Sequence, residues 1–259
     1  MGVKDAFDLT GKTAIVTGGS IGLGAQMAIG LAEAGANLVI AARNVERCQD
    51  ICKELEALGV RAIAVGCDVS DADSCQNLID TTVKEFGTVD ILVNNAGYTW
   101  AANAIDFPMD KWQQVIDLNL TGLFQLSVMA ARVMKEQGRG KIINVTSVAG
   151  MGGTRPEAQN TVPYNASKGA VITLTKDLAV KWARYGIYVN AIAPGFFPTH
   201  MSGGLLEKNK HMVIPMIPLG RLGGDEDLKA PIVFLSSAAS DYITGHVLMV
   251  EGGQSSQIG

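Results

Sequence analysis

The chain alternates between short runs of β-branched and other apolar residues and longer stretches with the character of helices. A short apolar run of this kind is typical of a strand buried on both faces of a sheet. The predicted strands are Thr13–Val16, Asn37–Ile40, Arg61–Val65, Ile91–Val93, Lys141–Val145, Tyr188–Ile192 and Val247–Val250.

A glycine follows each of the predicted helices except the last. Glycine in that position is a common C-cap, because it adopts the left-handed backbone conformation that ends many helices. The predicted helices are Gly24–Ala34, Val45–Leu58, Ser74–Phe86, Asp110–Gln137, Tyr164–Tyr185 and Asp225–Ser236.

Strands that alternate with helices of this length predict right-handed crossovers and a doubly wound parallel sheet with helices on both faces. We therefore expect an α/β fold with a single Rossmann-type domain over residues 1–259. Ligands of such folds bind at the carboxyl ends of the strands. The segment Phe197–Leu222, rich in proline, methionine and leucine, is predicted to be a substrate lid.

Composition narrows the classes of function. The chain has 259 residues, 47% of them hydrophobic, and a formal net charge of −4. It has no surplus of basic residues to neutralise phosphates, so nucleic acid is not an expected partner. Met1–Asp8 lacks the features of a signal peptide, and no apolar run approaches the ~20 residues of a membrane span. We expect a cytoplasmic protein with no membrane partner.

The four cysteines are expected to be small apolar core residues in a reducing compartment. Cys48 and Cys52 lie one helical turn apart, but no second cysteine pair or nearby histidine completes a zinc pattern. No metal site is therefore predicted.

A glycine-rich segment, Thr17-Gly18-Gly19-Ser20-Ile21-Gly22-Leu23-Gly24, joins the first predicted strand to the first predicted helix. A dinucleotide pyrophosphate needs backbone amides at a helix N-terminus and no Cβ in the way. Gly18 is expected to allow the tight turn, Gly22 the close approach and Gly24 the packing of helix on strand. A tight turn without a ligand has the same local pattern, so other motifs must decide between the two.

Tyr164 and Lys168 are candidates for chemistry, because they lie one turn apart and share a helix face. Hydride transfer to a carbonyl carbon leaves an alkoxide that must be protonated, and the reverse reaction needs a base. A tyrosine can serve in both directions if an adjacent ammonium lowers its pKa from ~10 toward neutrality. Taken alone, a pair with this spacing is more often two surface neighbours.

The glycine spacing is Thr-Gly-x-x-x-Gly-x-Gly rather than the commoner Gly-x-Gly-x-x-Gly. In this spacing the chain resembles the short-chain dehydrogenase/reductase family, and the resemblance extends from Leu9 to about Gly253. The other matching motifs occur in family order: Asn94-Asn95-Ala96-Gly97, Asn119, Ser147, Tyr164-x-x-x-Lys168 and Pro194-Gly195. The chain resembles two groups of family members about equally: those that act on gluconate-type sugar acids and those that act on 3-oxoacyl thioesters.

This resemblance implies a catalytic group of Asn119, Ser147, Tyr164 and Lys168. Tyr164 would be the general acid and base, and Ser147 would hold the substrate oxygen. Lys168 would lower the tyrosine pKa and bind the nicotinamide ribose. Asn119 would bend its long helix and anchor a water in a proton relay toward Lys168. Thr146 precedes Ser147, but the second hydroxyl position is the one that matches the family.

The second predicted strand ends without an acidic residue and leads into Arg43. An acid there binds the adenosine ribose hydroxyls, whereas an arginine accommodates a 2′-phosphate. Ser20 could supply a second contact to this phosphate, so we expect NADP(H) to be preferred over NAD(H). The alternative is that Arg43 is an ordinary cation at the start of a helix. The resemblance adds further cofactor contacts: Ile21, Asp68, Val69, Asn95, Ala96, Gly97, Pro194, Gly195, Phe197 and Thr199, with Tyr164 and Lys168.

The interval from Ser147 to Tyr164 is longer than the family's usual one by about four residues, an insertion that a loop tolerates at little cost. Arg155 in this loop either meets an anionic substrate or is solvated. The pocket is expected to be mainly apolar, and neither His200 nor His211 is a convincing base. Its expected lining is Tyr98, Trp100, Gly150–Arg155, Phe196, Phe197 and Met201–Met216.

The sequence thus predicts an oxidoreductase that interconverts a small-molecule ketone and a secondary alcohol, with NADPH-linked carbonyl reduction as the favoured direction. A sugar-acid or polyol dehydrogenase of the same fold is one alternative. A dinucleotide sensor without turnover is another, although a sensor has no reason to keep a tuned phenol. The helices Asp110–Gln137 and Tyr164–Tyr185 are apolar on more than one face, which together with the resemblance predicts a homotetramer.

Overall fold

The computed structural model describes residues 2–154, 160–198, 206 and 210–257. Its centre is a seven-stranded sheet with the order β3-β2-β1-β4-β5-β6-β7, and every neighbouring pair is parallel. The predicted doubly wound fold is confirmed. The strands are β1 (Thr13–Thr17), β2 (Asn37–Ala42), β3 (Ala62–Gly66), β4 (Ile91–Asn94), β5 (Gly140–Val145), β6 (Ile187–Pro194) and β7 (Val247–Val250).

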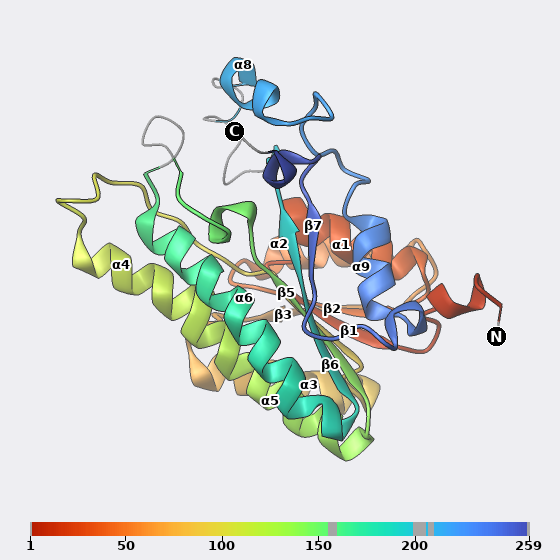
Figure 1. Cartoon of the computed structure of the whole chain (residues 1–259). Helices are drawn as coiled ribbons and strands as arrows, with labels where there is room; N and C mark the ends of the chain where they lie inside the picture. The colour runs from red at the N-terminus through yellow and green to blue at the C-terminus, as the bar shows by residue number, and fades with distance from the viewer. Residues whose placement is uncertain (1, 155–159, 199–205, 207–209, 258–259) are drawn as a thin grey trace.

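Helices cover both faces of the sheet (Figure 1). One face packs against α1 (Gly22–Glu33), α2 (Val45–Glu56) and α9 (Lys229–Ser236). The other packs against α3 (Ala72–Phe86), α5 (Leu123–Gln137) and α6 (Val162–Trp182). Ile15 and Val16 of β1 belong to different core clusters because successive strand side chains point to opposite faces.

The predicted helix Asp110–Gln137 is not regular along its length. It consists of α4 (Met109–Ile116), a π-helical turn over Asp117–Gly122, and α5. A Cβ added to Gly122 would lie 2.2 Å from the carbonyl oxygen of Val69, so this turn packs directly on the loop after β3. The widened turn lies at the position of Asn119, where a bend was predicted.

The last predicted helix, Asp225–Ser236, begins later than expected, at Lys229. The Asp227 carboxylate accepts a hydrogen bond of 2.7 Å from the Gly224 amide and one of 2.9 Å from Arg221. These contacts hold the preceding residues in a turn, because a short acidic side chain that bonds nearby backbone competes with the helix.

The described parts of the segment Phe197–Leu222 include a short helix, α8 (Lys210–Val213). Leu206, Val213 and Ile217 form an apolar cluster of their own, separate from the two sheet cores. The side chain of Gln257 donates to the Met216 carbonyl at 2.7 Å, so the end of the chain is bound to this segment. Its function as a lid stays a prediction.

No helix within the described residues is long and apolar enough to cross a membrane.

Candidate active site

The glycine-rich turn follows β1 and starts α1. Gly18 and Gly22 have positive φ angles of 61° and 57°, which only glycine adopts without strain. A Cβ on Gly24 would lie 2.2 Å from the Gly18 carbonyl oxygen, so the start of α1 packs directly on the glycine-rich turn. The N-cap residue Ile21 provides no side-chain hydrogen bond, which leaves the first amides of α1 available to an anion. This cradle fits a pyrophosphate.

The loop after β4 braces the turn. The Asn95 side chain donates to the carbonyls of Thr17 and Gly18 at 2.9 and 3.1 Å. The Thr17 hydroxyl in turn accepts from the backbone amides of Asn95 and Ala96, each at 3.0 Å. These contacts place the predicted residues Asn95, Ala96 and Gly97 beside the phosphate cradle.

Arg43 and Asp68 follow the ends of neighbouring strands, β2 and β3. The Asp68 carboxylate accepts from the hydroxyl and amide of Ser70 at 2.6 and 3.0 Å. These bonds, and more weakly the positive charge of Arg43, lower the pKa of Asp68. Arg43 is exposed, as a contact for an incoming 2′-phosphate must be.

Ser20 has a partner that was not predicted. Burial raises the pKa of the Cys48 thiol, and a hydrogen bond from the Ser20 side chain partly offsets this effect.

All four cysteines are buried and free, as expected of small core residues. No group of three or more histidine, cysteine or acidic residues in the described part of the chain is arranged to hold a metal ion.

Tyr164 and Ser147 come together at the start of α6 and the end of β5. Burial raises the pKa of Tyr164, and a hydrogen bond with Ser147 opposes the rise. The Ser147 hydroxyl also accepts from the Ala149 amide at 3.2 Å. Thr146 instead donates to the Lys168 carbonyl at 2.8 Å and is buried, so Ser147 is the hydroxyl that reaches the tyrosine.

Lys168 is buried, and burial lowers its pKa to about 8. Its ammonium donates to the Val145 carbonyl at 2.7 Å and lies 5.6 Å from the centre of the Tyr164 ring. The predicted lowering of the Tyr164 pKa is not found in this arrangement. Burial of the phenol dominates, and the nearest partner of the ammonium is a backbone carbonyl.

Asn119 lies in the π-helical turn and is fully buried. Its Oδ1 accepts from the Tyr98 amide at 2.8 Å, and its Nδ2 donates to the Tyr98 carbonyl at 2.9 Å. Nδ2 also donates to the Ser167 hydroxyl at 3.1 Å. A Cβ on Gly97 would lie 3.6 Å from Asn119 Oδ1 and 3.7 Å from Lys168 Nζ, so both groups border the same backbone.

The residues after β6 contribute in different ways. Gly195 is in tight contact with Glu251, and its amide donates to the Val250 carbonyl at 3.0 Å. Phe197 is buried in the core with its ring against Gly223, so its side chain does not line an open pocket. Thr199, Arg155 and His200 lie outside the described residues.

The expected substrate pocket includes one aromatic pair that the structure describes. The rings of Tyr98 and Trp100 lie 6.5 Å apart between centres, and the Lys111 ammonium lies 4.8 Å over Trp100. The Ala102 amide donates to the Asn160 carbonyl at 3.0 Å. This bond links the loop after β4 to the long loop between Ser147 and Tyr164.

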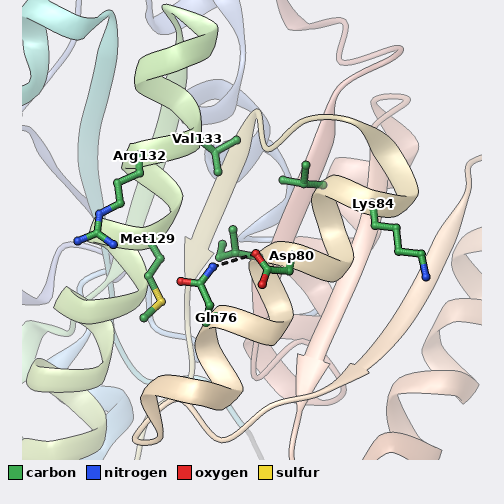
Figure 2. Close-up of a pocket in the computed structure, with 8 residues that line it drawn as sticks. Gln76, Asp80, Lys84, Met129, Arg132 and Val133 are labelled. Carbon is green, nitrogen blue, oxygen red and sulfur yellow. Dashed lines mark hydrogen bonds between the residues drawn. The ribbon is translucent and has the colours of Figure 1, made fainter.

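A separate groove of about 440 Å³ lies between α3 and α5 (Figure 2). Gln76 and Asp80 of α3, which are hydrogen-bonded at 2.8 Å, face Met129 and Arg132 of α5 across it. No residue of the catalytic group lines this groove.

Residues 12–210 match the short chain dehydrogenase family. A 2-dehydro-3-deoxy-D-gluconate 5-dehydrogenase from Dickeya dadantii is 40% identical over 255 residues, covering 97% of this chain and 98% of that protein. A 3-oxoacyl-[acyl-carrier-protein] reductase from Synechocystis is 41% identical over 247 residues, covering 95% and 97%.

Solved structures give the same result. A short-chain type dehydrogenase/reductase from Mycobacterium marinum superposes with a TM-score of 0.95 at 38% identity, covering 99% of this chain and 100% of that one. A gluconate 5-dehydrogenase from Burkholderia cenocepacia in complex with NADP and tartrate has a TM-score of 0.93 at 37% identity, covering 99% and 100%.

The chain belongs to the short-chain dehydrogenase/reductase family. Within that class it is an oxidoreductase that acts on an alcohol or ketone with a nicotinamide dinucleotide.

Proposed function

We propose that this protein is an NADP(H)-dependent oxidoreductase that reduces a small-molecule ketone to a secondary alcohol. The observation that carries the cofactor choice is the end of β2, where Arg43 is exposed and no acidic residue follows the strand. A guanidinium binds a 2′-phosphate through paired hydrogen bonds, whereas a carboxylate at this place would repel it. Several similar structures, such as that from Burkholderia cenocepacia, contain NADP.

The catalytic roles follow from the chemistry of the residues. The hydroxyls of Ser147 and Tyr164 hold the substrate oxygen, and Tyr164 gives its proton to that oxygen as the carbon is reduced. A bound nicotinamide supplies the hydride in reduction and accepts it in oxidation. Lys168 stabilises the phenolate that remains, because it is a buried cation on the same helix face. Asn119 keeps the loop after β4 in place beside Lys168.

The substrate class is proposed from the side chains of the loop after β4 and from the names of the relatives. Tyr98 and Trp100 supply an apolar wall, which suits a ketone on an acyl or ring framework. A sugar acid is the second candidate, since relatives at 40% and 39% identity are named for gluconate-type substrates.

A substrate panel tests these proposals. Purified protein is given NADPH with a 3-oxoacyl thioester, 5-ketogluconate and a cyclic ketone in turn, and NADPH absorbance is followed. Oxidation of NADPH by the thioester or the cyclic ketone supports the first proposal. Turnover of 5-ketogluconate alone would favour the sugar-acid dehydrogenase, and no turnover with any of them would contradict the reductase proposal.

We also propose that the protein is a homotetramer. Phe124 of α5 and Val180 of α6 are 43% and 80% exposed, although both lie on long helices that pack on the sheet. Apolar side chains left exposed on such helices are typical of subunit interfaces.

A further inference from the structure

Ser167 is a buried hydroxyl that the catalytic roles above do not use. It lies on α6 between Tyr164 and Lys168 and is 0% exposed. Its hydroxyl donates to the Tyr164 carbonyl at 2.8 Å and accepts from Asn119 Nδ2 at 3.1 Å. It therefore joins the helix that carries the tyrosine and lysine to the π-helical turn that carries the asparagine.

Ser167 is one of two partners of the Asn119 amide, the other being the backbone of Tyr98. A serine hydroxyl has one proton, and here that proton is used by the Tyr164 carbonyl. Toward Asn119, Ser167 can only accept, so its bond agrees with the orientation that the amide and carbonyl of Tyr98 already impose. Both Nδ2 protons are then used, by Tyr98 and Ser167, and Oδ1 retains one free acceptor position.

The bond between Ser167 and Asn119 bears on the position of Lys168. Lys168 follows Ser167 directly on α6, and its ammonium borders Gly97 together with Asn119 Oδ1. The bond therefore ties the part of α6 that carries the lysine to the π-helical turn.

We propose that Ser167 is a positioning residue for catalysis, which ties α6 to the π-helical turn through Asn119 and so holds the Lys168 ammonium beside Tyr164. This inference rests on the proposed roles of Tyr164 and Lys168. It goes beyond them in assigning a function to a residue that touches neither substrate nor reacting atoms.

The chain contains a matched control in Ser127. It is also 0% exposed, accepts from a buried asparagine, Asn94, at 2.8 Å, and donates to the Leu123 carbonyl at 2.7 Å. Ser167→Ala and Ser127→Ala therefore remove the same kind of bond and leave the same kind of unpaired amide proton. Both variants should lower Tm by a few degrees. Only Ser167 is linked to the catalytic group.

The experiment measures the ionisation of Tyr164 without any substrate. Protein loaded with NADP⁺ is titrated with base, and phenolate absorbance is compared with that of the same protein carrying Tyr164→Phe, so that the difference belongs to Tyr164. In Ser167→Ala we expect the midpoint to rise by about 0.5–1 pH unit, because a less well held ammonium stabilises the phenolate less. Ser127→Ala should titrate like the unmodified protein.

Two further variants keep the test decisive. Ser167→Thr retains the hydroxyl acceptor and should restore the midpoint. Ser167→Cys fills the space with a poor acceptor and should behave like Ser167→Ala, which covers the case in which the alanine variant does not fold. An unchanged midpoint in Ser167→Ala or Ser167→Cys, or an equal rise in Ser127→Ala, would overturn the proposal.

This titration separates two kinds of failure. If the Tyr164 titration is resolved in every variant but no ketone of the panel is reduced, the substrate proposal fails and the positioning role is judged by the midpoints alone. If the panel works and the midpoints do not move, the positioning role fails while the proposed function stands.

Discussion

At the scale of single residues, burial sets the chemistry of the site. Lys168 is buried and Tyr164 is partly buried, and each is pushed toward its neutral form: the phenol pKa rises and the ammonium pKa falls to about 8. Their opposite charges stabilise each other only when both are ionised. Small changes in the groups around Lys168 are therefore expected to change the pH at which the tyrosine acts.

Arg43 provides a test of cofactor choice. Arg43→Gln should raise the KM for NADPH about 10–100-fold, because hydrogen bonds to a charged phosphate are lost, and leave the KM for NADH nearly unchanged. Steady-state kinetics with both cofactors measures the effect. Arg61→Gln, which removes an arginine that stacks on Phe86 just before β3, is the control and should alter neither KM. A lower KM for NADH than for NADPH in the unmodified enzyme would refute the assignment.

Asp227 gives a prediction about pH and stability. Its hydrogen bonds to Arg221 and Gly224 lower its pKa from 3.8 to about 2. A carboxyl with a lowered folded pKa stabilises the protein above its unfolded pKa, and this contribution is lost as the pH falls from about 4 toward 2. The pair is partly exposed, so Asp227→Asn should cost only about 0.5–1 kcal/mol at pH 7. Urea unfolding at pH 7 and pH 3 should show the difference shrinking, and a constant difference would contradict it.

At the scale of elements, the π-helical turn is the link between the two halves of the site. It holds Asn119 against the loop after β4, and through Gly122 it packs on Val69 in the loop that follows β3. Val69 is a predicted cofactor contact. The turn thus connects Val69 to α6, the helix that carries the proposed catalytic residues Tyr164 and Lys168.

Gly122→Ala should disturb both the π-helical turn and the loop after β3 that carries Val69. The added Cβ would lie 2.2 Å from the Val69 carbonyl, so the loop must move. We expect a loss of about 1–3 kcal/mol in the free energy of unfolding and a clear rise in the Kd for NADPH. Denaturant unfolding and fluorescence titration measure the two effects. Gly152→Ala, whose Cβ would meet nothing within 4 Å, is the control. An unchanged Kd for NADPH in Gly122→Ala would contradict the prediction that the π-helical turn supports cofactor binding.

Element positions were predictable from the sequence because the strand runs and the glycines after helices are local signals. Gly87, Gly138 and Gly186 do adopt the left-handed conformation at helix ends. The resemblance implied a bend at Asn119, but the π-helical form of that bend and the late start of α9 were not predictable from local patterns. The first depends on a tertiary contact with Val69. The second depends on the bonds that the Asp227 side chain makes to Gly224 and Arg221 in place of a helical turn.

The proposed catalytic residues were predictable only as a set of motifs in family order. Ser147 and Tyr164 are brought together as expected. Ser167 was not predicted, although it lies within the same motif. A serine between a tyrosine and a lysine gives no sign in the sequence of its hydrogen bond to Asn119. The rise of the Tyr164 pKa was also not predicted, because the burial that causes it is a property of the fold.

At the scale of the whole molecule, the exposed apolar residues of α5 and α6 predict assembly. Sedimentation at micromolar concentration should give about four times the chain mass of 27.2 kDa. Val180→Glu, which places a charge on the exposed face of α6, should produce smaller species without unfolding the chain. A monomeric mass for the unmodified protein would contradict the tetramer.

The central claim is that Tyr164 is the proton donor of an enzyme, rather than part of a dinucleotide sensor. Tyr164→Phe removes only the hydroxyl. We predict that kcat for ketone reduction falls by about 10²–10⁴-fold while the Kd for NADPH, measured by fluorescence titration, stays within about twofold. Retention of full activity in Tyr164→Phe, with the cofactor bound as before, would contradict the account.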